Sequence, residues 1–441
     1  MVITLFAAFL ASAAFEPIGL WFLAIFGFAL YFRKLADGDR PVLNSFIFGF
    51  TLNAIVLHWS GKYVGVLPWL LLALLQSLFY LPIGLIYRRT SSLWLSALVL
   101  LLMEELRARF PFGGFGWTRI AFSQVESPAL PIVAIGGVLA LSAFTLVIAI
   151  LLTRFGAKSL IAIAALCIAA LFLPENPQGS GSVRLLAVQG NTPEVGLEFN
   201  SRAKAVFNLH RDATREFAKE PYDAIIWPEN AIDIDPRKNP EVAADITALT
   251  NELQTPLIAG VVQRENGSPE NASIMYSKAG QMQSVYIKRG LTPFGEFMPL
   301  RKIAEFVSPI AKMVVDFVPG DKLVTHAING EKLGPIICYE IIIDSLVRDM
   351  ANSSKALIVQ TNSATFANTP ESAQQLAITR IRAVEHSRAI LSVSTIGISA
   401  FIDNNGRVLS ETAENKRASL VGNLQLNTNK TFIDRLIQWI S

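Results

Sequence analysis

The distribution of apolar residues is the strongest constraint on what this chain can fold into. Residues 1–173 are almost continuous apolar runs, whereas residues 183–428 mix polar and apolar side chains as globular domains do. Over the whole chain 52% of residues are hydrophobic and only 17% are charged, compared with about 25% charged in a typical soluble domain. The contrast predicts a membrane-embedded first half and a second half that is long enough to bury a core of its own.

We expect seven membrane-spanning helices in the first half. A helix needs about 20 predominantly apolar residues to cross a bilayer. The apolar runs, several of them shorter than this, cover Val2–Ala14, Leu20–Phe32, Asn44–Trp59, Leu67–Tyr87, Leu93–Leu106, Pro131–Leu152 and Leu160–Leu173. The segment Phe15–Gly19 separates the first two runs, because its proline interrupts helical hydrogen bonding.

The loops between these runs predict their orientation. Basic residues gather in alternate loops, at Arg33, Lys34, Arg40, Arg88, Arg89, Arg154 and Lys158. Because cytoplasmic loops are enriched in lysine and arginine, we expect the N-terminus inside, and seven crossings then place the second half outside the membrane. The alternative that the first run is a cleaved signal peptide is less consistent, since the run lacks the basic segment that begins such peptides.

Polar residues within the first half leave two interpretations open. Glu104 and Glu105 lie at or near membrane depth, and the loop Arg109–Arg119 is rich in glycine and aromatic residues. Charges in a membrane are costly and usually face a cavity or a partner, which suits a functional, lipid-contacting loop. Simple packing of the loop accounts for the same residues equally well.

The composition also predicts where the globular half begins and ends. A linker at residues 174–182 precedes a domain at residues 183–428, and a tail follows at residues 429–441. The tail includes the amphipathic stretch Thr431–Ser441, which is too short to span a bilayer. We therefore expect it to lie at the membrane interface or to be a truncated span.

Strands and helices alternate through residues 183–428. Helical periodicity covers Val195–Lys219, Glu241–Leu253, Ile341–Met350 and Ser372–Ser387. Strand-like segments cover Arg184–Gln189, Asp223–Glu229, Pro256–Gln263, Ala272–Ser277, Gln283–Lys288, Gly334–Cys338, Ala356–Asn362, Ala389–Gly397, Ser399–Leu409 and Ala418–Leu426. Asn404–Gly406 is a turn signal within the segment Ser399–Leu409. This alternation, with hairpins, predicts a layered α/β domain without an internal repeat in the sequence. The net charge of +3, with no basic stripe, gives no indication of nucleic-acid binding.

Charged side chains stand where predicted strands end, the edge at which α/β domains keep their sites. Glu229 ends an apolar strand, and desolvation there would raise its pKa toward the range of a general base. Lys288 follows another strand, with Glu296 eight positions later, so the lysine can stabilise a developing oxyanion while the carboxylate keeps it charged. Each residue taken alone is also typical of an ordinary solvated loop.

Cys338 is the candidate nucleophile. The chain has only two cysteines, and Cys167 lies in an apolar run as packing, so a disulfide framework is excluded. We expect Cys338 where a strand meets a helix, because the helix N-terminus and a nearby lysine would favour the thiolate. The alternative is a buried cysteine without a chemical role.

The histidines do not suggest another chemistry. None of the four, His58, His210, His326 and His386, lies in a segment typical of a cysteine protease, and no cluster has zinc-ligand spacing. The sequence is more consistent with a catalytic set of a glutamate, a lysine and a cysteine than with a cysteine–histidine pair. We expect neither a metal nor a cofactor.

Three segments in order along the chain carry a family resemblance: Trp227–Asn230 (WPEN), Lys288–Leu300 (KRGLTPFGEFMPL) and Gly334–Glu340 (GPIICYE). They resemble the catalytic segments of the nitrilase, or carbon–nitrogen hydrolase, superfamily. Together with Val188–Asn191 (VQGN) and the multi-span half, they resemble the apolipoprotein N-acyltransferase family over most of the chain. The resemblance implies a multi-span α-helical membrane domain plus an α/β domain, a nitrilase-like αββα sandwich, on the extracytoplasmic side of a bacterial plasma membrane.

The resemblance also implies roles and partners. Glu229 would be the general base, Lys288 the oxyanion-stabilising lysine, Cys338 the nucleophile, and Glu296 and Glu340 supporting carboxylates. In the family the cysteine takes an acyl chain from a phospholipid as a thioester. The α-amino group of a lipoprotein's N-terminal diacylglyceryl-cysteine then attacks that thioester. The implied partners are therefore a phospholipid donor and a diacylglyceryl-lipoprotein acceptor, and we expect a monomer.

The sequence departs from the family pattern in two places. Many members carry NDAWFG after the strand that follows the cysteine, whereas Thr361–Phe366 reads TNSATF, so no role carries over to this loop. Members also commonly have a final membrane span, where this chain has only its short tail.

Two other classes of protein fit parts of the sequence. A membrane-tethered nitrilase-type amidase that hydrolyses a small amide would use the same Glu–Lys–Cys set, but a small soluble substrate needs no multi-span half. A transporter or scaffold with an inactive nitrilase-like domain would have no reason to keep Glu229, Lys288 and Cys338 together.

Overall fold

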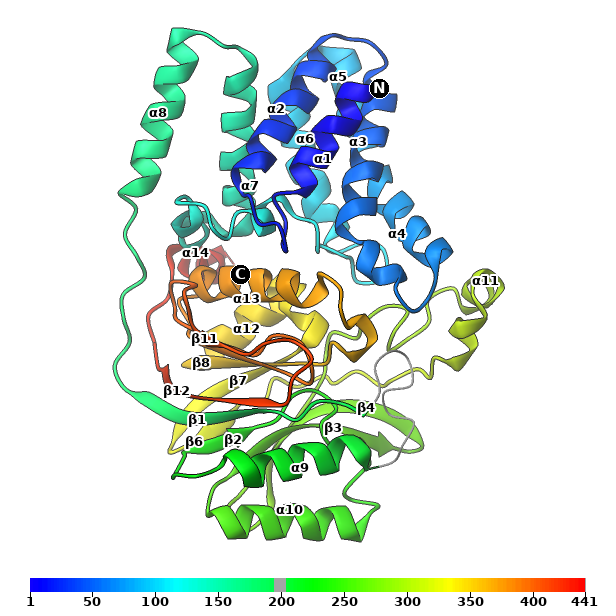
Figure 1. Cartoon of the computed structure of the whole chain (residues 1–441). Helices are drawn as coiled ribbons and strands as arrows, with labels where there is room; N and C mark the ends of the chain where they lie inside the picture. The colour runs from blue at the N-terminus through cyan, green and yellow to red at the C-terminus, as the bar shows by residue number, and fades with distance from the viewer. Residues whose placement is uncertain (194–203, 441) are drawn as a thin grey trace. The chain divides into compact units, whose positions relative to one another are not determined.

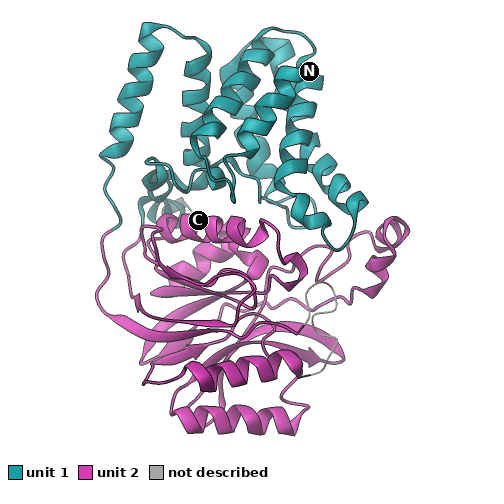
Figure 2. Ribbon diagram, in the orientation of Figure 1, with its two compact units in different colours: residues 1–176, 431–441 teal, residues 177–430 magenta. Residues whose placement is uncertain are grey.

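The computed structural model describes residues 1–193 and 204–440, and it divides into two compact units (Figure 2). Unit 1 combines Met1–Asn176 with Thr431–Ser441, and unit 2 is Pro177–Lys430. The two units differ in their secondary structure, because unit 1 is helical and unit 2 is built from sheets and helices.

Unit 1 is a bundle of apolar helices. They are α1 (Val2–Ser12), α2 (Phe22–Ala36), α3 (Pro41–Val56), α4 (Val66–Leu78), α5 (Leu81–Thr90), α6 (Leu93–Arg107), α7 (Val133–Thr153), α8 (Ala157–Leu171) and α14 (Phe432–Ile440), with short 3₁₀ turns at His58–Gly61, Ile120–Ser123 and Leu130–Ile132. Within the described residues two stretches, Val66–Thr90 and Leu130–Thr153, are long and apolar enough to cross a membrane. The expectation of seven spans therefore stays a prediction.

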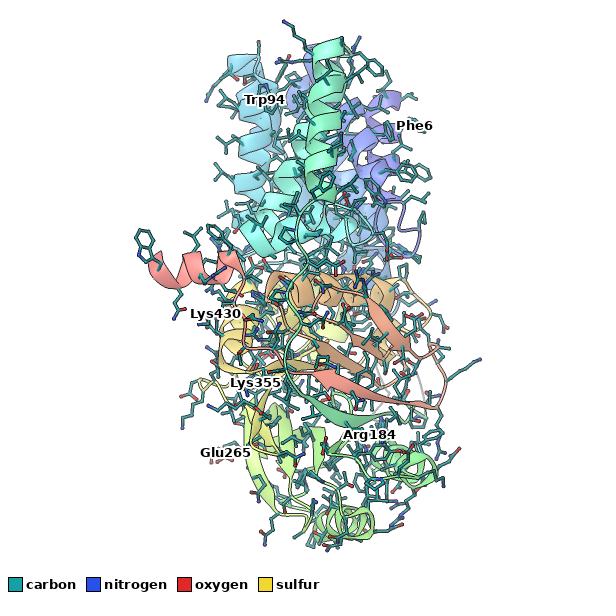
Figure 3. The ribbon with its side chains drawn as sticks, turned by 90° about the vertical axis from the view of Figure 1, so that its left-hand side faces the viewer. Phe6, Trp94, Arg184, Glu265, Lys355 and Lys430 are labelled. Atoms are coloured by element: carbon teal, nitrogen blue, oxygen red, sulfur yellow. The ribbon has the colours of Figure 1, made fainter. Side chains whose placement is uncertain are left out.

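The packing of unit 1 brings small residues together and leaves large apolar ones outside. A β-carbon added to Gly27 of α2 would lie 2.6 Å from the backbone nitrogen of Ala11, so α1 and α2 approach more closely than larger residues would allow. Such contacts between small residues are typical of helices packed in lipid. Figure 3 shows Phe6 and Trp94 on the outside of the bundle, and both side chains are exposed.

Unit 2 contains two six-stranded sheets. The first has the order β12 (Ala418–Gln425), β1 (Ser182–Gln189), β2 (Ala224–Ile226), β3 (Leu257–Glu265), β4 (Ser268–Tyr276) and β5 (Met282–Ile287). The second has the order β11 (Val408–Glu411), β10 (Ala400–Ile402), β9 (Ile390–Ser394), β8 (Ala356–Thr361), β7 (Glu331–Ile337) and β6 (His326–Ile328). Each sheet has three parallel central strands, β1–β2–β3 and β7–β8–β9, extended by antiparallel neighbours.

The sheets and helices of unit 2 form four layers (Figure 1). One core lies between the two sheets, where residues such as Leu185, Ile226 and Ile358 are completely buried. A second core packs the first sheet against α9 (Ala205–Phe217) and α10 (Pro240–Leu253). The second sheet is covered by α12 (Asp344–Ser353) and α13 (Glu371–Glu385), while α11 (Arg301–Val307) projects from the body of the unit. The prediction of a layered α/β domain in the second half of the chain is confirmed.

The order of elements in unit 2 occurs twice. The series β1, α9, β2, α10, β3, β4, β5 corresponds in sheet order and strand direction to β7, α12, β8, α13, β9, β10, β11. No internal repeat is apparent in the amino-acid sequence, because the correspondence lies in the order and direction of the strands and not in residue identities.

Two element boundaries differ from the sequence prediction. Helix α12 begins at Asp344, and Cys338–Ile342 form a 3₁₀ turn instead of the start of a helix. Strand β2 ends at Ile226, so Glu229 lies beyond the sheet, whereas the turn predicted at Asn404–Gly406 is confirmed between β10 and β11. The helix predicted over Val195–Lys219 contains α9, and residues 195–203 lie outside the described residues.

Candidate active site

The candidate site residues of unit 2 follow the carboxyl ends of its strands. Glu229 comes after β2 and Lys288 directly after β5, both in the first sheet, while Cys338 comes directly after β7 in the second. Strand β2 and most of β7 are buried, whereas β5 is the edge strand of the first sheet and is only partly buried. All three groups lie just beyond the carboxyl end of a strand, where α/β folds place their sites.

Lys288 lies between two carboxylates. Its Nζ atom is 2.8 Å from Glu296 Oε2 and 3.3 Å from Glu229 Oε1, and the lysine side chain is only 1% exposed. The backbone N–H of Thr292 donates to Glu296 Oε2 at 2.8 Å, so the loop that carries Glu296 also orients it. The structure thus brings together three of the residues that the sequence singled out.

Asn271 of β4 joins the two carboxylates from the other side. Its Nδ2 atom donates to Glu229 Oε1 at 2.7 Å and to Glu296 Oε1 at 2.8 Å. The antiparallel register of β4 and β5 brings Asn271 next to Lys288, whose backbone N–H donates to the Asn271 carbonyl. Sequence reasoning missed Asn271, although the register of the predicted hairpin could have revealed it.

The charges of this group are strongly perturbed. Burial raises the pKa of Glu229, an effect opposed by the Lys288 charge and reinforced by the Glu296 charge. Burial alone would also raise the pKa of Glu296, but the ion pair with Lys288 holds it below its usual value. Although burial opposes its charge, Lys288 has a raised pKa because both carboxylates surround it. Lys288 and Glu296 therefore form the charged pair, and Glu229 is the carboxylate better able to take up a proton.

Cys338 occupies an unusual backbone conformation. Its φ is +48°, in the left-handed region that a residue with a β-carbon rarely adopts, and it turns the chain sharply from β7 into the 3₁₀ turn. Gln375 of α13 donates from Nε2 to the Cys338 sulfur at 3.7 Å. The strained turn holds the thiol in a fixed position.

The protonation of Cys338 differs from the sequence expectation. Burial and then the negative charge of Glu229 raise the pKa of the thiol well above its ordinary value, and the Lys288 charge only partly opposes them. The expected thiolate is therefore wrong for the resting protein: α12 begins at Asp344, too late to stabilise it, and carboxylates surround the sulfur. A protonated, half-buried thiol of this kind needs a general base to become a nucleophile.

Glu340 ties the cysteine turn to the lysine loop. Its Oε1 atom accepts from the Tyr286 hydroxyl at 2.7 Å and from the backbone N–H groups of Arg289 and Gly290 at 2.7 and 3.0 Å. Its Oε2 atom accepts from the Ile337 N–H at 2.8 Å. With four donors and complete burial, this carboxylate positions the loop after β5 against the turn after β7.

Helix α13 supports the same turn and carries residues that sequence reasoning missed. The completely buried Arg382 donates to the carbonyls of Ile341 and Ile342 and pairs with Glu385 and Asp344. One face of the first turns of α13 carries Glu371 and Gln375. Their role could not be predicted from the sequence. Helical periodicity shows which residues share one face of a helix, but it does not show which strand end that face contacts.

The loop Thr361–Phe366, whose sequence differs from the family pattern, lies beside the first turn of α13. Ser363 hydrogen-bonds the Glu371 carboxylate, and Asn362 accepts from the Thr395 hydroxyl at 2.8 Å. The loop thus supports α13. In the part of the chain that the structure describes, no group of three or more histidine, cysteine, aspartate or glutamate residues has the arrangement of a metal site.

Comparisons with known protein families cover both units. The model of the apolipoprotein N-acyltransferase N-terminal domain matches residues 7–151, and the model of carbon-nitrogen hydrolases matches residues 185–433. An apolipoprotein N-acyltransferase from Mycolicibacterium smegmatis is 33% identical over 95% of this chain and 78% of its own length. One from Azotobacter vinelandii is 30% identical over 96% of this chain and 88% of its own length.

Solved structures that are similar to part of this chain include a Nesterenkonia sp. amidase. This amidase is 15% identical, with a TM-score of 0.44 over 60% of this chain and 98% of that chain. The carbon-nitrogen hydrolase superfamily protein XC1258 from Xanthomonas campestris is 18% identical, with a TM-score of 0.41 over 55% of this chain and 90% of that chain.

Proposed function

The chain belongs to the apolipoprotein N-acyltransferase family within the carbon–nitrogen hydrolase superfamily, and we propose that its acyl transfer runs through Cys338. It moves an acyl chain from a phospholipid to the α-amino group of the N-terminal diacylglyceryl-cysteine of lipoproteins. The observation that carries the assignment of residues is the buried contact of Lys288 with Glu229 and Glu296, beside a thiol with a raised pKa.

In the first step Glu229 takes the proton of the Cys338 thiol, and the sulfur attacks the ester carbonyl of the phospholipid. The positive charge of Lys288 stabilises the oxyanion that forms. The carbon–oxygen bond of the ester then breaks, Glu229 returns the proton to the departing alkoxide, and a lysophospholipid leaves. Glu229 and Lys288 end this step as a carboxylate and an ammonium, as they began.

In the second step the unprotonated amine of the acceptor attacks the thioester. Glu229 takes one proton from the nitrogen and gives it to the departing sulfur, while Lys288 stabilises the second oxyanion. The product is an amide, and the free thiol is restored. Because the acyl group rests on the enzyme between the two substrates, the kinetics are ping-pong.

Two supporting carboxylates complete the assignment. Glu296 keeps Lys288 charged and aimed through its 2.8 Å ion pair. Glu340 holds the lysine loop against the cysteine turn through Tyr286 and three backbone donors. Both act on the geometry of the site and do not exchange protons with the substrates.

We further propose the placement of the chain in a bacterial plasma membrane. Residues 1–173 form a multi-pass domain of seven spans, residues 174–182 a linker, residues 183–428 the catalytic domain on the extracytoplasmic side, and residues 429–441 an interfacial helix; the protein acts as a monomer. Support comes from the bacterial relatives, the two long apolar stretches and the exposed apolar side chains of unit 1. In α14 the side chain of Trp439 is 85% exposed, which suits an interface.

Unit 2 has an apolar surface of its own that suits a lipid substrate. Large apolar side chains lie exposed in α11 and in the segments on either side of it, at Leu300, Ile303, Phe306, Met313 and Val315, with Phe306 90% exposed. This segment follows Glu296 directly in the chain. Exposed apolar groups concentrated in one segment favour contact with lipid or with a lipidated partner.

The test is to purify the full chain in detergent, add phospholipid with a labelled acyl chain, and then add a diacylglyceryl-cysteine peptide. We expect a labelled thioester on the protein, followed by amide-linked label on the peptide. Cys338→Ala should abolish both, whereas the matched variant Cys167→Ala should keep both. A thioester that persists in Cys338→Ala overturns the choice of nucleophile, and hydrolysis of small amides without acyl transfer would favour the amidase alternative.

A further inference from the structure

We propose that Glu371 is the carboxylate that binds the α-ammonium group of the acceptor and takes its first proton. The inference rests on the proposed acyl transfer and adds a residue to its second step. It starts from a buried carboxylate that the mechanism above leaves unused.

The first turn of α13 brings Glu371 to the cysteine. Gln375 reaches the Cys338 sulfur at 3.7 Å, and Glu371 lies four residues earlier on the same face of the helix. The Glu371 charge acts on the thiol, since it contributes to the raised pKa of Cys338. The carboxylate therefore lies in the neighbourhood where the thioester would form.

Glu371 is buried but not fully bonded. Ser363 and Ser372 hydrogen-bond its carboxylate, while its Oε2 atom is buried without any partner among the described residues. Leaving a buried oxygen atom without a hydrogen-bond donor is unfavourable. Glu385, at the other end of α13, is by contrast paired with Arg382. An unpaired oxygen beside the nucleophile indicates a polar ligand that is absent from the free protein.

The electrostatics of the pocket favour a cation as that ligand. The two charges that act most strongly on Glu371 are those of the carboxylates Glu414 and Glu229, and the nearby Cys338 can only add negative charge. Lys288 is already paired with Glu296 and Glu229. A primary ammonium group would supply the missing donor and the missing positive charge together, whereas water or an alcohol would supply only a donor.

The proton balance of the second step requires such a base. An α-amino group has a pKa of about 7.7–8.0, so the acceptor arrives mainly as an ammonium and must lose two protons to become an amide. Glu229 handles only the proton that passes to sulfur. Glu296 is held as the partner of Lys288, and Glu340 already accepts from four donors. Glu371 is the remaining carboxylate among those that act most strongly on the thiol.

The protonation range of Glu371 suits this task. Burial, opposed by the Ser363 hydrogen bond and reinforced by the charges of Glu414 and Glu229, raises the pKa of Glu371 to about 7. Its carboxylate can accept a proton from an α-ammonium group whose pKa lies slightly higher, and can release it to solvent between turnovers. The N–H bond of the ammonium breaks, an O–H bond forms on Glu371, and the neutral amine then attacks.

The experiment separates the two steps in the full chain in detergent. Thioester formation from labelled phospholipid is timed first, and the isolated acyl-enzyme is then mixed either with a diacylglyceryl-cysteine peptide or with hydroxylamine, whose nitrogen is already unprotonated at neutral pH. Glu371→Gln should form the thioester no more slowly than the wild type, because a negative charge near the thiol is removed. Transfer to the peptide at pH 7 should fall at least tenfold, while the reaction with hydroxylamine stays within twofold.

Two companion variants and a pH profile complete the design. Glu371→Asp should recover part of the transfer, and Glu414→Gln, which removes a charge from the same neighbourhood, should keep it. The peptide transfer rate of the wild type should rise through about pH 7, and that of Glu371→Gln only as the acceptor amine itself deprotonates.

Each outcome decides between the claims. A wild-type protein that forms no thioester overturns the proposed function. A thioester that forms normally, with unchanged peptide transfer in Glu371→Gln, overturns the role of Glu371 alone. Equal losses toward peptide and hydroxylamine would show that Glu371 only packs the site, and would also overturn it.

Discussion

Two buried charged clusters, one in each unit, differ in how their charges balance. In unit 1, Arg107 pairs with Glu104 at 3.3 Å and donates to the hydroxyl and carbonyl of Thr118 and to Gln76. Glu104 also accepts from the Ile120 N–H at 2.8 Å. One cation meets one anion, and the remaining bonds fix the loop that follows α6.

The cluster of unit 2 has an excess of negative charge. Lys288 faces Glu229 and Glu296, and Glu371 adds a further carboxylate on the side of Cys338. Their burial and mutual repulsion move several pKa values, whereas a balanced pair serves mainly to hold structure. Both clusters bury charge, but only the cluster of unit 2 buries charge that is not balanced by an opposite charge. Such an unbalanced buried charge is typical of a proton-transfer site, whereas a balanced pair mainly stabilises structure.

The largest expected effect is on the rate of thioester formation, when Glu229 in the charged cluster of unit 2 is replaced. Glu229→Gln keeps the size of the side chain and an acceptor for Asn271, but it removes the base that activates the thiol. Thioester formation should fall between about 10² and 10⁴-fold, with thermal unfolding little changed. The measurement is the rate of acyl-enzyme formation in detergent, with the surface variant Glu265→Gln as control. A loss below tenfold would mean that another group activates Cys338.

The sequence predicts this cluster better than it predicts its surroundings. Lys288 and Glu296 are eight residues apart in one loop, and Glu229 and Cys338 follow apolar strands, so patterns along the chain were enough to select them. The apolar runs also separated the two kinds of unit. An apolar run followed by a polar residue predicts the end of a strand, because the polar side chain is unfavourable in the core.

The missed residues depend on packing between segments far apart in the sequence. Asn271 lies within a strand, and Glu371 and Gln375 lie on a helix, so only the strand register and the packing of α13 on the second sheet bring them to the site. The direction of the Cys338 pKa was also missed, since it depends on burial and on the number of carboxylates that surround the sulfur.

The next effect tests the balanced cluster of unit 1. Arg107→Met removes the cation and leaves Glu104 buried without it, which should cost about 3 kcal/mol of stability. The melting temperature in detergent should fall, and less protein should be recovered folded. The rate of thioester formation per titrated thiol should stay within twofold, because the cluster holds structure only. A lower rate in correctly folded protein would show that the cluster contributes to turnover.

A smaller effect is expected from the pH dependence of stability at Glu371. The folded pKa of about 7 lies above the ordinary value of 4.5, so the folded state binds the proton more tightly. The associated stabilisation is complete below about pH 4.5 and is lost as the pH rises through 7, a change of about 3 kcal/mol. Glu371→Gln, which cannot titrate, should therefore gain in melting temperature relative to the wild type between pH 5 and pH 8, while Glu371→Asp should retain part of the wild-type trend. A constant difference across this range would contradict the raised pKa.

The smallest effect concerns the loop Arg109–Arg119, for which the sequence allows either simple packing or contact with lipid. Arg109 and Arg119 share Glu105, at 2.8 and 2.9 Å, but the Arg109 side chain is 72% exposed and that of Arg119 is buried. An exposed ion pair contributes about 0.2–1 kcal/mol, so Arg109→Ala should scarcely change the melting temperature, whereas Arg119→Ala should lower it clearly. Because Arg107 and Glu104 already hold the loop at Thr118 and Ile120, acyl transfer in Arg109→Ala should also stay within twofold. A fall of more than twofold in acyl transfer from phospholipid, with the melting temperature unchanged, would show that the loop contacts lipid. Unit 1 would then take part in substrate binding as well as in structure.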